Sequence, residues 1–493
     1  MKVIPTLAVC AILLSSRCLS AAGEPDSYVN GPDSLPQAGV PKGELIKFEF
    51  ADSRIFPGTT RQVTVYVPRQ YDPAKPACVY IGQDGVQWNA PVVLDNLIAR
   101  GEVPVIVGVF VTPGVVPPRD PKAALPRFNR SLEYDGLGDD FARMLLEEVL
   151  PAVETKMTAD GRPVRLSHSG NDRAIGGGSS GAIAAFNAAW EHPEAFSRVV
   201  SSVGTYIGLR GADRFPTLIR KYEPKPIRVF LQDGSHDLNI YAGDWWMANQ
   251  TMERALTFSG YEVNHVWGDG SHNGKHISSV LPDAMRWVWK DWPKPVGNGP
   301  THNAALAALL IPGEGWQSAV ASVTVRRVPY ATEGGQVWRL GSDGSRHAVD
   351  TGLDLATAVT LSPDRSLLYV AEGRTHWIYS YEVEADGTLA DRQRYYWLHT
   401  DDLDDQSHAV SMCCDEAGWL YVATGLGVQV CDQAGRVNAI LPLPGGAATS
   451  VRFGGGKRDT LFASCGDTLY MRRLNAVGVD PTGTPVLPPA PHL

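Results

Sequence analysis

The chain is poor in cysteine, with seven in 493 residues. It contains no C-x-x-C pair, which argues against a structural zinc site. Two of the seven, Cys10 and Cys18, fall in a predicted leader, and the odd number that remains does not build a disulfide framework. One disulfide bridge is still possible among the last four cysteines, which are Cys413, Cys414, Cys431 and Cys465.

Clusters of basic residues and membrane-length apolar runs are also missing. The formal net charge of −9 and a pI near 5.8 come without any Lys/Arg cluster, so nucleic acid is not an expected partner. The apolar run at residues 3–14 is shorter than the about 20 residues of a membrane-spanning helix. It lies between Lys2 and the small residues 20–22, a pattern typical of a secretory signal peptide. We therefore predict that residues 1–22 are cleaved off and that the mature protein is secreted or periplasmic.

From about residue 48 to residue 293, β-rich apolar runs alternate with segments of helical periodicity. This alternation predicts a mainly parallel sheet wrapped by helices, the doubly wound α/β class. The predicted strands are residues 63–68, 78–82, 104–111, 173–177, 198–203, 227–232 and 262–267. The predicted helices are residues 141–154, 182–190, 245–258 and 278–292.

Residues 292–300 break this alternation with three prolines and two glycines, which indicates a domain boundary. Short β runs then recur at intervals of about 40 residues, as the blades of a propeller do. About four such units fit before Val479, so we expect a small or incomplete all-β propeller. The predicted organisation is an α/β domain at 44–293, a linker at 294–312 and the propeller at 313–480.

The pentapeptide Gly177–Gly181 reads G-x-S-x-G and lies between a predicted strand and an alanine-rich predicted helix. A nucleophile at such a strand-to-helix turn occupies strained backbone, so the residues two positions to either side must lack side chains. Gly177 and Gly181 meet this condition, which makes Ser179 the candidate nucleophile. A glycine-rich turn with incidental serines is the alternative.

Partners for Ser179 occur in the order acid then base, as this fold requires. Asp237 follows a predicted buried strand, and His272 follows the last one, where ligands gather in α/β sheets. The sequence leaves two alternatives for the acid and one for the base. Asp233 is an alternative acid that lies closer to its strand, and Asp244 is another, although it could instead cap a helix. His276 is the alternative base.

Other residues are expected to complete the site. The oxyanion donors would be the Ser180 amide and the backbone around Gly85 or Val86. Four aromatic residues in the surrounding loops could stack on a sugar or an aryl acid, although core packing is the alternative for each. These are Trp88, Tyr206, Trp245 and Trp246. No cofactor and no metal ion is expected.

Residues 44–293 resemble the enterochelin-esterase-like esterases, an α/β-hydrolase group related to feruloyl and acetyl-xylan esterases. The resemblance rests on IGQDGVQWNAPVVLDNLI, the G-x-S-x-G motif, AAWEHPEAFSRVVSSVG, VFLQDGSHDLNIY and GSHNGKHISSVLPDAMRWVW. It implies that Ser179 is the nucleophile, Asp237 the acid and His272 the base. The base of that family lies about ten residues before a Leu-Pro pair, here Leu281-Pro282, which favours His272 over His276.

The chain after about Leu310 resembles the gluconolactonase and senescence-marker-protein family of propellers. AVTLSPDRSLLYVAEG, EAGWLYVATGLGVQVCDQAGRVN and DTLFASCGDTLYMRRL carry the likeness. That resemblance implies a divalent cation held by carboxylate and amide oxygens. Thr357 and Val410 stand where the family's ligands are expected, so lactonase chemistry is not predicted here.

Taken together, these features predict an exported serine esterase that cleaves carboxylic esters on carbohydrate or polyphenolic substrates. Two alternatives stay open. One is a non-catalytic carbohydrate-binding protein of two domains, since a hydrolase fold alone does not imply activity. The other is a sugar lactonase that acts through the propeller.

Overall fold

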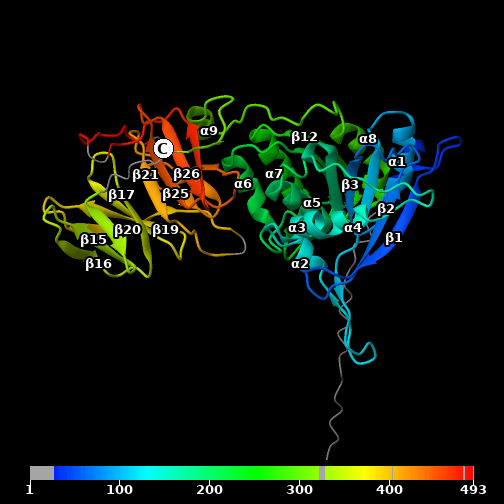
Figure 1. The fold of residues 1–493 in the computed structure, drawn as a ribbon, viewed down its shortest axis with the longest axis horizontal. Helices are drawn as coiled ribbons and strands as arrows, with labels where there is room; N and C mark the ends of the chain where they lie inside the picture. The colour runs from blue at the N-terminus through cyan, green and yellow to red at the C-terminus, as the bar shows by residue number, and fades with distance from the viewer. Residues whose placement is uncertain (1–26, 321–327, 402–403, 481–482, 492–493) are drawn as a thin grey trace, which may run out of the picture.

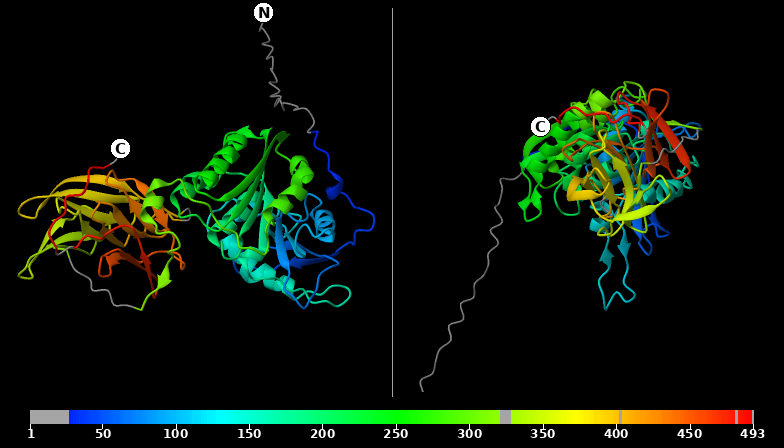
Figure 2. Two further views of the ribbon diagram at one scale, coloured as in Figure 1. Left: turned by 90° about the horizontal axis from the view of Figure 1, so that it is seen from above. Right: turned by 90° about the vertical axis from the view of Figure 1, so that its left-hand side faces the viewer.

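The computed structural model describes residues 27–320, 328–401, 404–480 and 483–491, so the predicted signal peptide lies outside the described residues. Figures 1 and 2 show two bodies side by side. One is built from the blue-to-green part of the chain and contains a sheet with helices. The other is built from the yellow-to-red part and consists mainly of strands.

An eight-stranded sheet forms the frame of the first region, in the order β1-β2-β4-β3-β7-β8-β9-β12. β2 is antiparallel to both of its neighbours, whereas the pairs from β4 to β12 are parallel. The predicted α/β class is therefore confirmed, with a mixed sheet. The strands are β1 (Glu44–Phe50), β2 (Arg61–Val67), β3 (Cys78–Gln83), β4 (Ile106–Val111), β7 (Arg173–Gly178), β8 (Arg198–Ser202), β9 (Arg228–His236) and β12 (Glu262–Ser271).

Helices cover both faces of this sheet, because its central strands are apolar on both sides. α1 and α8 pack on one face, and α3 to α7 pack on the other. None of the helices in the described part of the chain combines the length and apolar character needed to cross a bilayer. The helices are α1 (Ala90–Ala99), α2 (Arg130–Tyr134), α3 (Asp140–Arg143), the π-helical η2 (Met144–Val149), α4 (Leu150–Glu154), α5 (Ser180–Glu191), α6 (Phe215–Lys221), α7 (Trp245–Phe258) and α8 (Lys275–Val288).

Short elements complete the first region. Two small hairpins and three 3₁₀ turns lie between the main strands and helices. They are β5 (Val115–Val116) with β6 (Arg127–Phe128), β10 (Asn239–Ile240) with β11 (Gly243–Asp244), η1 (Pro32–Ser34), η3 (Gly170–Asp172) and η4 (Ala212–Arg214).

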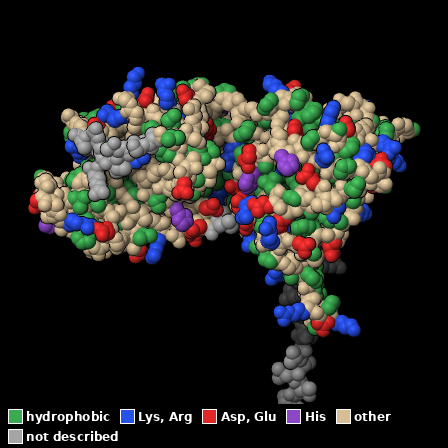
Figure 3. All heavy atoms as spheres, in the orientation of Figure 1, with side chains coloured by type: hydrophobic (Ala, Val, Ile, Leu, Met, Phe, Trp, Pro, Cys, Tyr) green, Lys and Arg blue, Asp and Glu red, His purple; other side chains and the backbone are tan. Residues whose placement is uncertain are grey.

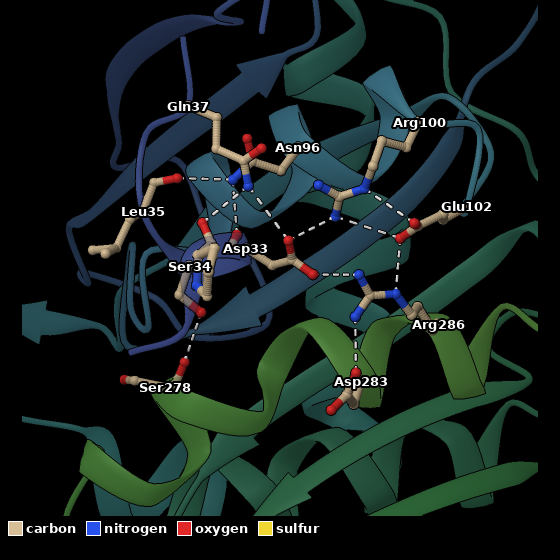
Figure 4. A network of polar contacts seen from close by, with 11 residues as sticks. Asp33, Ser34, Leu35, Gln37, Asn96, Arg100, Glu102, Ser278, Asp283 and Arg286 are labelled. Carbon is tan, nitrogen blue, oxygen red and sulfur yellow. Dashed lines mark hydrogen bonds and ion pairs between the residues drawn. The ribbon is translucent and has the colours of Figure 1, made fainter. Parts of the chain in front are cut away.

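The segment before β1 is fastened to α1 and α8 by a polar network (Figure 4). The Asp33 carboxylate pairs with Arg286 and with Arg100, whose guanidinium lies 2.9 Å away. The hydrogen bond from Arg286 lowers the pKa of Asp33. Asn96 donates from its amide to the carbonyl oxygens of Asp33 (2.8 Å) and Leu35 (3.0 Å). Residues 33–35 are thus held against the same sheet face as α1.

The second region contains four small antiparallel sheets arranged as a propeller. β13 comes before the blades in the chain but pairs with β27 near the C-terminus and so adds a strand to the last sheet. The inner strands β14, β17, β21 and β25 line a cavity of about 910 Å³. The strands are β13 (Gln317–Ser318), β14 (Tyr330–Glu333), β15 (Gln336–Leu340), β16 (Arg346–Asp350), β17 (Ala356–Leu361), β18 (Leu367–Glu372), β19 (Trp377–Val383), β20 (Leu389–Trp397), β21 (Ser411–Cys414), β22 (Leu420–Thr424), β23 (Gly427–Cys431), β24 (Val437–Leu441), β25 (Ser450–Gly454), β26 (Thr460–Cys465) and β27 (Thr468–Arg473).

All five cysteines of the described residues are free thiols. The disulfide bridge that the sequence left open within the second region is therefore not formed. Burial raises the pKa of the Cys431 thiol far above its usual range, so this side chain behaves as a small apolar group of the propeller core.

The short helix α9 (Ala304–Leu309) lies between the two regions. Asn303 caps it by accepting hydrogen bonds from the amides of Ala305 (3.0 Å) and Leu306 (3.1 Å). The buried Leu306 and Leu309 pack into the propeller core together with Tyr421. The chain thus enters the second region through a capped and packed helix.

Candidate active site

Ser179 occupies the turn between β7 and α5. Its backbone has φ +58° and ψ −125°, a region that residues with a side chain seldom adopt. The Ser179 amide donates to the carbonyl oxygen of Ser202 on β8 (2.9 Å), which holds the turn above the sheet. A Cβ on Gly177 would overlap the carbonyl of Gly181, and one on Gly181 would lie 3.0 Å from Asp84 Oδ2. The glycines are therefore required where strand and helix approach each other.

Two loops from the same edge of the sheet bring Asp237 and His272 to this turn. Asp237 follows β9, and His272 follows β12, which runs parallel to β9. His272 Nε2 lies 2.8 Å from Ser179 Oγ, and its Nδ1 lies 2.5 Å from Asp237 Oδ1. The Asp237 side chain is wholly buried, whereas that of His272 is 21% exposed. The structure thus brings the three predicted side chains into one hydrogen-bonded chain.

This order of contacts fixes the tautomer of the imidazole. A carboxylate only accepts hydrogen bonds, so His272 carries its proton on Nδ1 and donates it to Asp237. The lone pair of Nε2 then faces Ser179 Oγ. In this tautomer His272 can accept the serine proton.

Thr205, which the sequence analysis did not single out, contacts the same hydroxyl. Its Oγ1 lies 3.2 Å from Ser179 Oγ and accepts a hydrogen bond from Trp245 Nε1, also at 3.2 Å. Because His272 Nε2 offers a lone pair to Ser179 Oγ, the serine proton points to His272, and in the contact with Thr205 the threonine hydroxyl is therefore the donor. Ser179 Oγ accepts this bond, and its own proton is left for His272. The chain of donors therefore runs Trp245, Thr205, Ser179, His272.

The rival residues have other partners. Asp244 caps α7 by accepting from the Met247 amide (3.0 Å). His276 is buried, hydrogen-bonds Gln232 through Nδ1 (2.9 Å) and stacks on Tyr28. Asp233 contacts Asp237 and not the imidazole. None of the three rivals occupies the position of Asp237 or His272.

The three predicted oxyanion donors differ in whether their backbone N–H group already has a hydrogen-bond acceptor. The Ser180 amide lies at the first position of α5, where helix N–H groups have no acceptor within the helix. The Gly85 amide donates to the carbonyl of Val111 (3.1 Å), so the prediction for Gly85 is wrong, because its proton extends the β3–β4 pairing. The neighbouring Val86 amide has no acceptor among the described residues. Ser180 and Val86 are the available pair.

An ion pair holds the Val86 loop against the turn. Arg130 binds both carboxylate oxygens of Asp84, at 2.8 and 2.9 Å, and also donates to the Gly178 carbonyl (3.4 Å). Its hydrogen bond with Asp84 raises the pKa of Arg130. Bidentate pairing of this kind adds geometric precision to charge. Arg130, which no motif marked, therefore connects the loop after β3 to the residue before Ser179.

Of the four predicted aromatic residues, Trp88 lies beside the loops that carry Ser179 and His272. Its indole ring lies against Gly178, which precedes Ser179, and against Gly274 in the loop of His272. It also lines a cavity of about 650 Å³ together with Tyr28 and Lys275. Trp88 is thus positioned between the two loops that carry Ser179 and His272.

The other three aromatic residues do not offer free faces to a ligand in this cavity. Tyr206 is 2% exposed and bonds Ser201 through its hydroxyl (2.9 Å), so it is a core residue and its predicted substrate role is wrong. Trp245 is buried and packs edge-on against His272. Trp246 packs edge-on against Trp267 on β12. Trp245 supports the imidazole, and Trp246 belongs to the packing of α7 on the sheet.

The described part of the propeller lacks the ligand set of a metal site. Within the described ranges no group of three or more His, Cys, Asp or Glu side chains is arranged to hold an ion. The Thr357 hydroxyl is bonded to the Ala409 carbonyl (2.5 Å), and Val410 carries no oxygen in its side chain. These two positions therefore offer no carboxylate to a hard cation.

Comparison with known families divides the chain as the fold does. Residues 55–291 match the family described as "Putative esterase", and residues 319–466 match the "SMP-30/Gluconolactonase/LRE-like region". Both resemblances stated from the sequence are thereby confirmed. The α/β region thus matches an esterase family, and the four-bladed region that follows it matches a gluconolactonase-like family.

Individual relatives cover only parts of the chain. A pentonolactonase, XacC of Haloferax volcanii, is 31% identical over 142 residues, which are 28% of this chain and 47% of that protein. The chain thus spans about half the length of this curated relative. A solved ferulic acid esterase shares 18% identity over 50% of this chain and 99% of its own, with a TM-score of 0.39. The enterobactin esterase of Shigella flexneri shares 20% identity over 51% and 61%, also with a TM-score of 0.39.

Proposed function

We propose that the protein is an exported serine esterase that hydrolyses carboxylic esters of carbohydrate or polyphenolic substrates through an acyl-enzyme. The observation that carries the proposal is the hydrogen-bonded chain from Ser179 through His272 to Asp237 at a strained strand-to-helix turn. The match of residues 55–291 to an esterase family supports a hydrolase that acts on esters. Export rests on the leader pattern of residues 1–22 alone.

In the proposed reaction, Ser179 Oγ attacks the ester carbonyl carbon while its proton passes to His272 Nε2. Asp237 stabilises the imidazolium that forms. The amides of Ser180 and Val86 donate to the oxyanion of the tetrahedral intermediate. Collapse of the intermediate breaks the bond to the alcohol, which leaves with the proton from His272.

A water molecule completes the cycle. His272 Nε2 takes one proton from the water as its oxygen attacks the acyl carbon, and the second tetrahedral intermediate expels Ser179 Oγ. The proton returns to the serine, and the carboxylic acid is released. No step requires a group beyond this chain and water.

A fluorophosphonate probe tests the nucleophile directly. The wild-type protein should become labelled and should hydrolyse acetyl, feruloyl or glucuronoyl esters, whereas Ser179→Ala should lose both properties. Ser169→Ala is the matched control, because Ser169 is exposed and its side chain caps no helix. An unlabelled wild-type protein contradicts the proposal and favours the non-catalytic binding alternative. Label retained in Ser179→Ala also contradicts the proposal, because it shows that another residue reacts with the probe.

Lactone hydrolysis by the propeller is the second candidate, favoured by the gluconolactonase-like match of residues 319–466. It predicts activity on sugar lactones that a chelator abolishes and that Ser179→Ala leaves intact. The bonded Thr357 and the apolar Val410 weigh against it. Activity that needs Ser179 and survives a chelator would exclude this candidate.

A further inference from the structure

A second carboxyl group lies behind the acid of the proposed triad. Asp233 is within β9 and wholly buried, four residues before Asp237, whose side chain is also wholly buried. Asp237 Oδ1 accepts from His272 and from the Leu238 amide (2.6 Å). Asp233 Oδ1 accepts from the Gly234 amide (2.7 Å). One oxygen of each carboxyl group is thus satisfied.

The remaining oxygens lack a donor. Asp233 Oδ2, Asp237 Oδ2 and Asn249 Oδ1 are all buried, and no hydrogen bond reaches any of them within the described residues. The Asp233 carboxyl nevertheless contacts the side chains of both Asp237 and Asn249. Within the described residues, these neighbouring oxygens are therefore buried acceptors that no N–H or O–H group of another residue reaches.

Asn249 cannot supply the missing proton. Its amide donates to the carbonyl oxygens of Gly204 (2.9 Å) and Trp245 (3.0 Å), which uses both of its hydrogens. In the described part of the chain, the only basic side chain paired with either carboxyl group is His272, which contacts Asp237 and not Asp233. On the neighbouring strand, Trp267 and Gly268 face Asp233 and Gly234 and bring no charge.

Two adjacent carboxylates in a buried site do not both ionise, because each charge raises the free energy of the other. We propose that Asp233 is protonated at neutral pH and donates a hydrogen bond to Asp237 Oδ2, so that it acts as a positioning residue for the triad. This inference rests on the proposed serine-esterase function. With this bond in place, both oxygens of Asp237 are satisfied and Oδ1 stays directed at His272 Nδ1.

Electrostatics favour the same assignment. Burial, reinforced by the hydrogen bond and the charge of Asp237, raises the pKa of Asp233 to about 9. Below this pH the proton is present and the pair carries one negative charge. As the pH rises through about 9, Asp233 ionises, the two carboxylates repel each other and Asp237 is pushed from its position against the imidazole.

Two variants separate this role from simple packing. Asp233→Asn has the same shape, and since the Gly234 amide holds its oxygen, the amide nitrogen faces Asp237 and donates at every pH. Asp233→Ala removes the donor. We expect Asp233→Asn to keep kcat near the wild-type value at pH 7 and to lose the decline in kcat near pH 9. Asp233→Ala should lower kcat about tenfold, the effect of one hydrogen bond, at unchanged KM.

The measurement is the pH profile of kcat on a p-nitrophenyl ester between pH 6 and about 10.5, with Ser179→Ala as the blank for spontaneous hydrolysis. Thermal unfolding of each variant checks that it is folded. Retention of the alkaline decline in Asp233→Asn, or an equal loss of kcat in both variants, overturns the proposal.

Infrared spectroscopy tests for the proposed proton on Asp233 and does not depend on ester hydrolysis. The difference spectrum of wild type minus Asp233→Asn should contain the C=O stretch of a protonated carboxylic acid at pH 7, and this band should vanish above about pH 10. If the wild-type protein hydrolyses esters but shows no such band, the proposal for Asp233 is refuted and the proposed function stands. A protein that shows the band but hydrolyses no ester refutes the proposed function alone.

Discussion

At the scale of single residues, the Thr205 hydroxyl contacts the hydroxyl of Ser179, the proposed nucleophile. Trp245 donates to Thr205, and because the Ser179 proton is directed at His272 Nε2, Thr205 is the donor in its contact with Ser179. A side chain that fills the same space without a hydroxyl would free Ser179 to rotate. The nucleophile would then spend less time in the orientation needed for proton transfer.

Thr205→Val should therefore lower kcat about 3- to 10-fold, as expected for the loss of one hydrogen bond, and leave KM unchanged. Thr205→Ser is the matched control, because it keeps the hydroxyl and should stay near the wild-type rate. Steady-state kinetics on a p-nitrophenyl ester provide both parameters. Equal rates in Thr205→Val and wild type would show that the contact has no part in the reaction.

The sequence analysis predicted the three hydrogen-bonded residues at the centre of the site more accurately than the residues that surround them. Ser179, Asp237 and His272 were found because their order and their places after strands follow from the fold. Gly85 and Tyr206 were misplaced, since whether an amide is already bonded or a ring points inward depends on the path of a loop. Thr205 and the contact of Asp233 with Asp237 depend on atomic neighbours that no spacing rule encodes.

At the scale of elements, the β7–α5 turn depends on two missing side chains. A methyl group on Gly177 would overlap the Gly181 carbonyl, which is backbone and cannot move aside without lifting α5 from the sheet. Gly181 lies against Gln83 and Asp84 at the end of β3. The turn therefore connects the nucleophile to the strand that leads to the Val86 loop.

Gly177→Ala should destabilise the protein by about 2 kcal/mol or more, since overpacking against backbone typically costs 1–3 kcal/mol, and should abolish ester hydrolysis. Gly297→Ala is the control, because nothing lies within 4 Å of the added carbon and its φ is not positive. Chemical denaturation measures the free energy of unfolding of both variants. Equal stabilities would show that the turn adapts to a side chain.

The strands and helices predicted from the sequence were those with a strong pattern. Continuous apolar runs indicated the central strands, whereas β1 alternates half-buried and exposed residues as an edge strand and was not singled out. α1 is buried over most of its surface and shows no polar face, and α6 has only seven residues. Periodicity carries little information about such elements.

At the scale of the whole molecule, the end of α6 joins the first region to the propeller. The amide of Glu223 donates to the Ile440 carbonyl (3.1 Å), and Asn303 donates to the carbonyls of Arg220 and Asn438, both at 2.8 Å. These bonds link backbone of the first region to β24. We therefore expect the propeller to contribute to the stability of the α/β region through these bonds.

The strongest of these contacts is an ion pair. Both carboxylate oxygens of Glu223 accept from Arg472 on β27, at 2.5 and 2.8 Å, and the Arg472 side chain is only 3% exposed. The same guanidinium donates to the Glu314 carbonyl (2.7 Å). Since Arg472 is buried, loss of its partner would leave a desolvated charge without compensation.

Glu223→Gln should therefore lower the free energy of unfolding by about 2 kcal/mol, less than the 3–5 kcal/mol of a fully buried pair because Glu223 retains some exposure. It should also split the calorimetric transition, so that the two regions unfold separately. Glu333→Gln is the matched control, because its pair with Arg346 is exposed on both sides and such pairs contribute at most about 1 kcal/mol. A single transition with the same small shift in both variants would show that the regions are not coupled through Glu223.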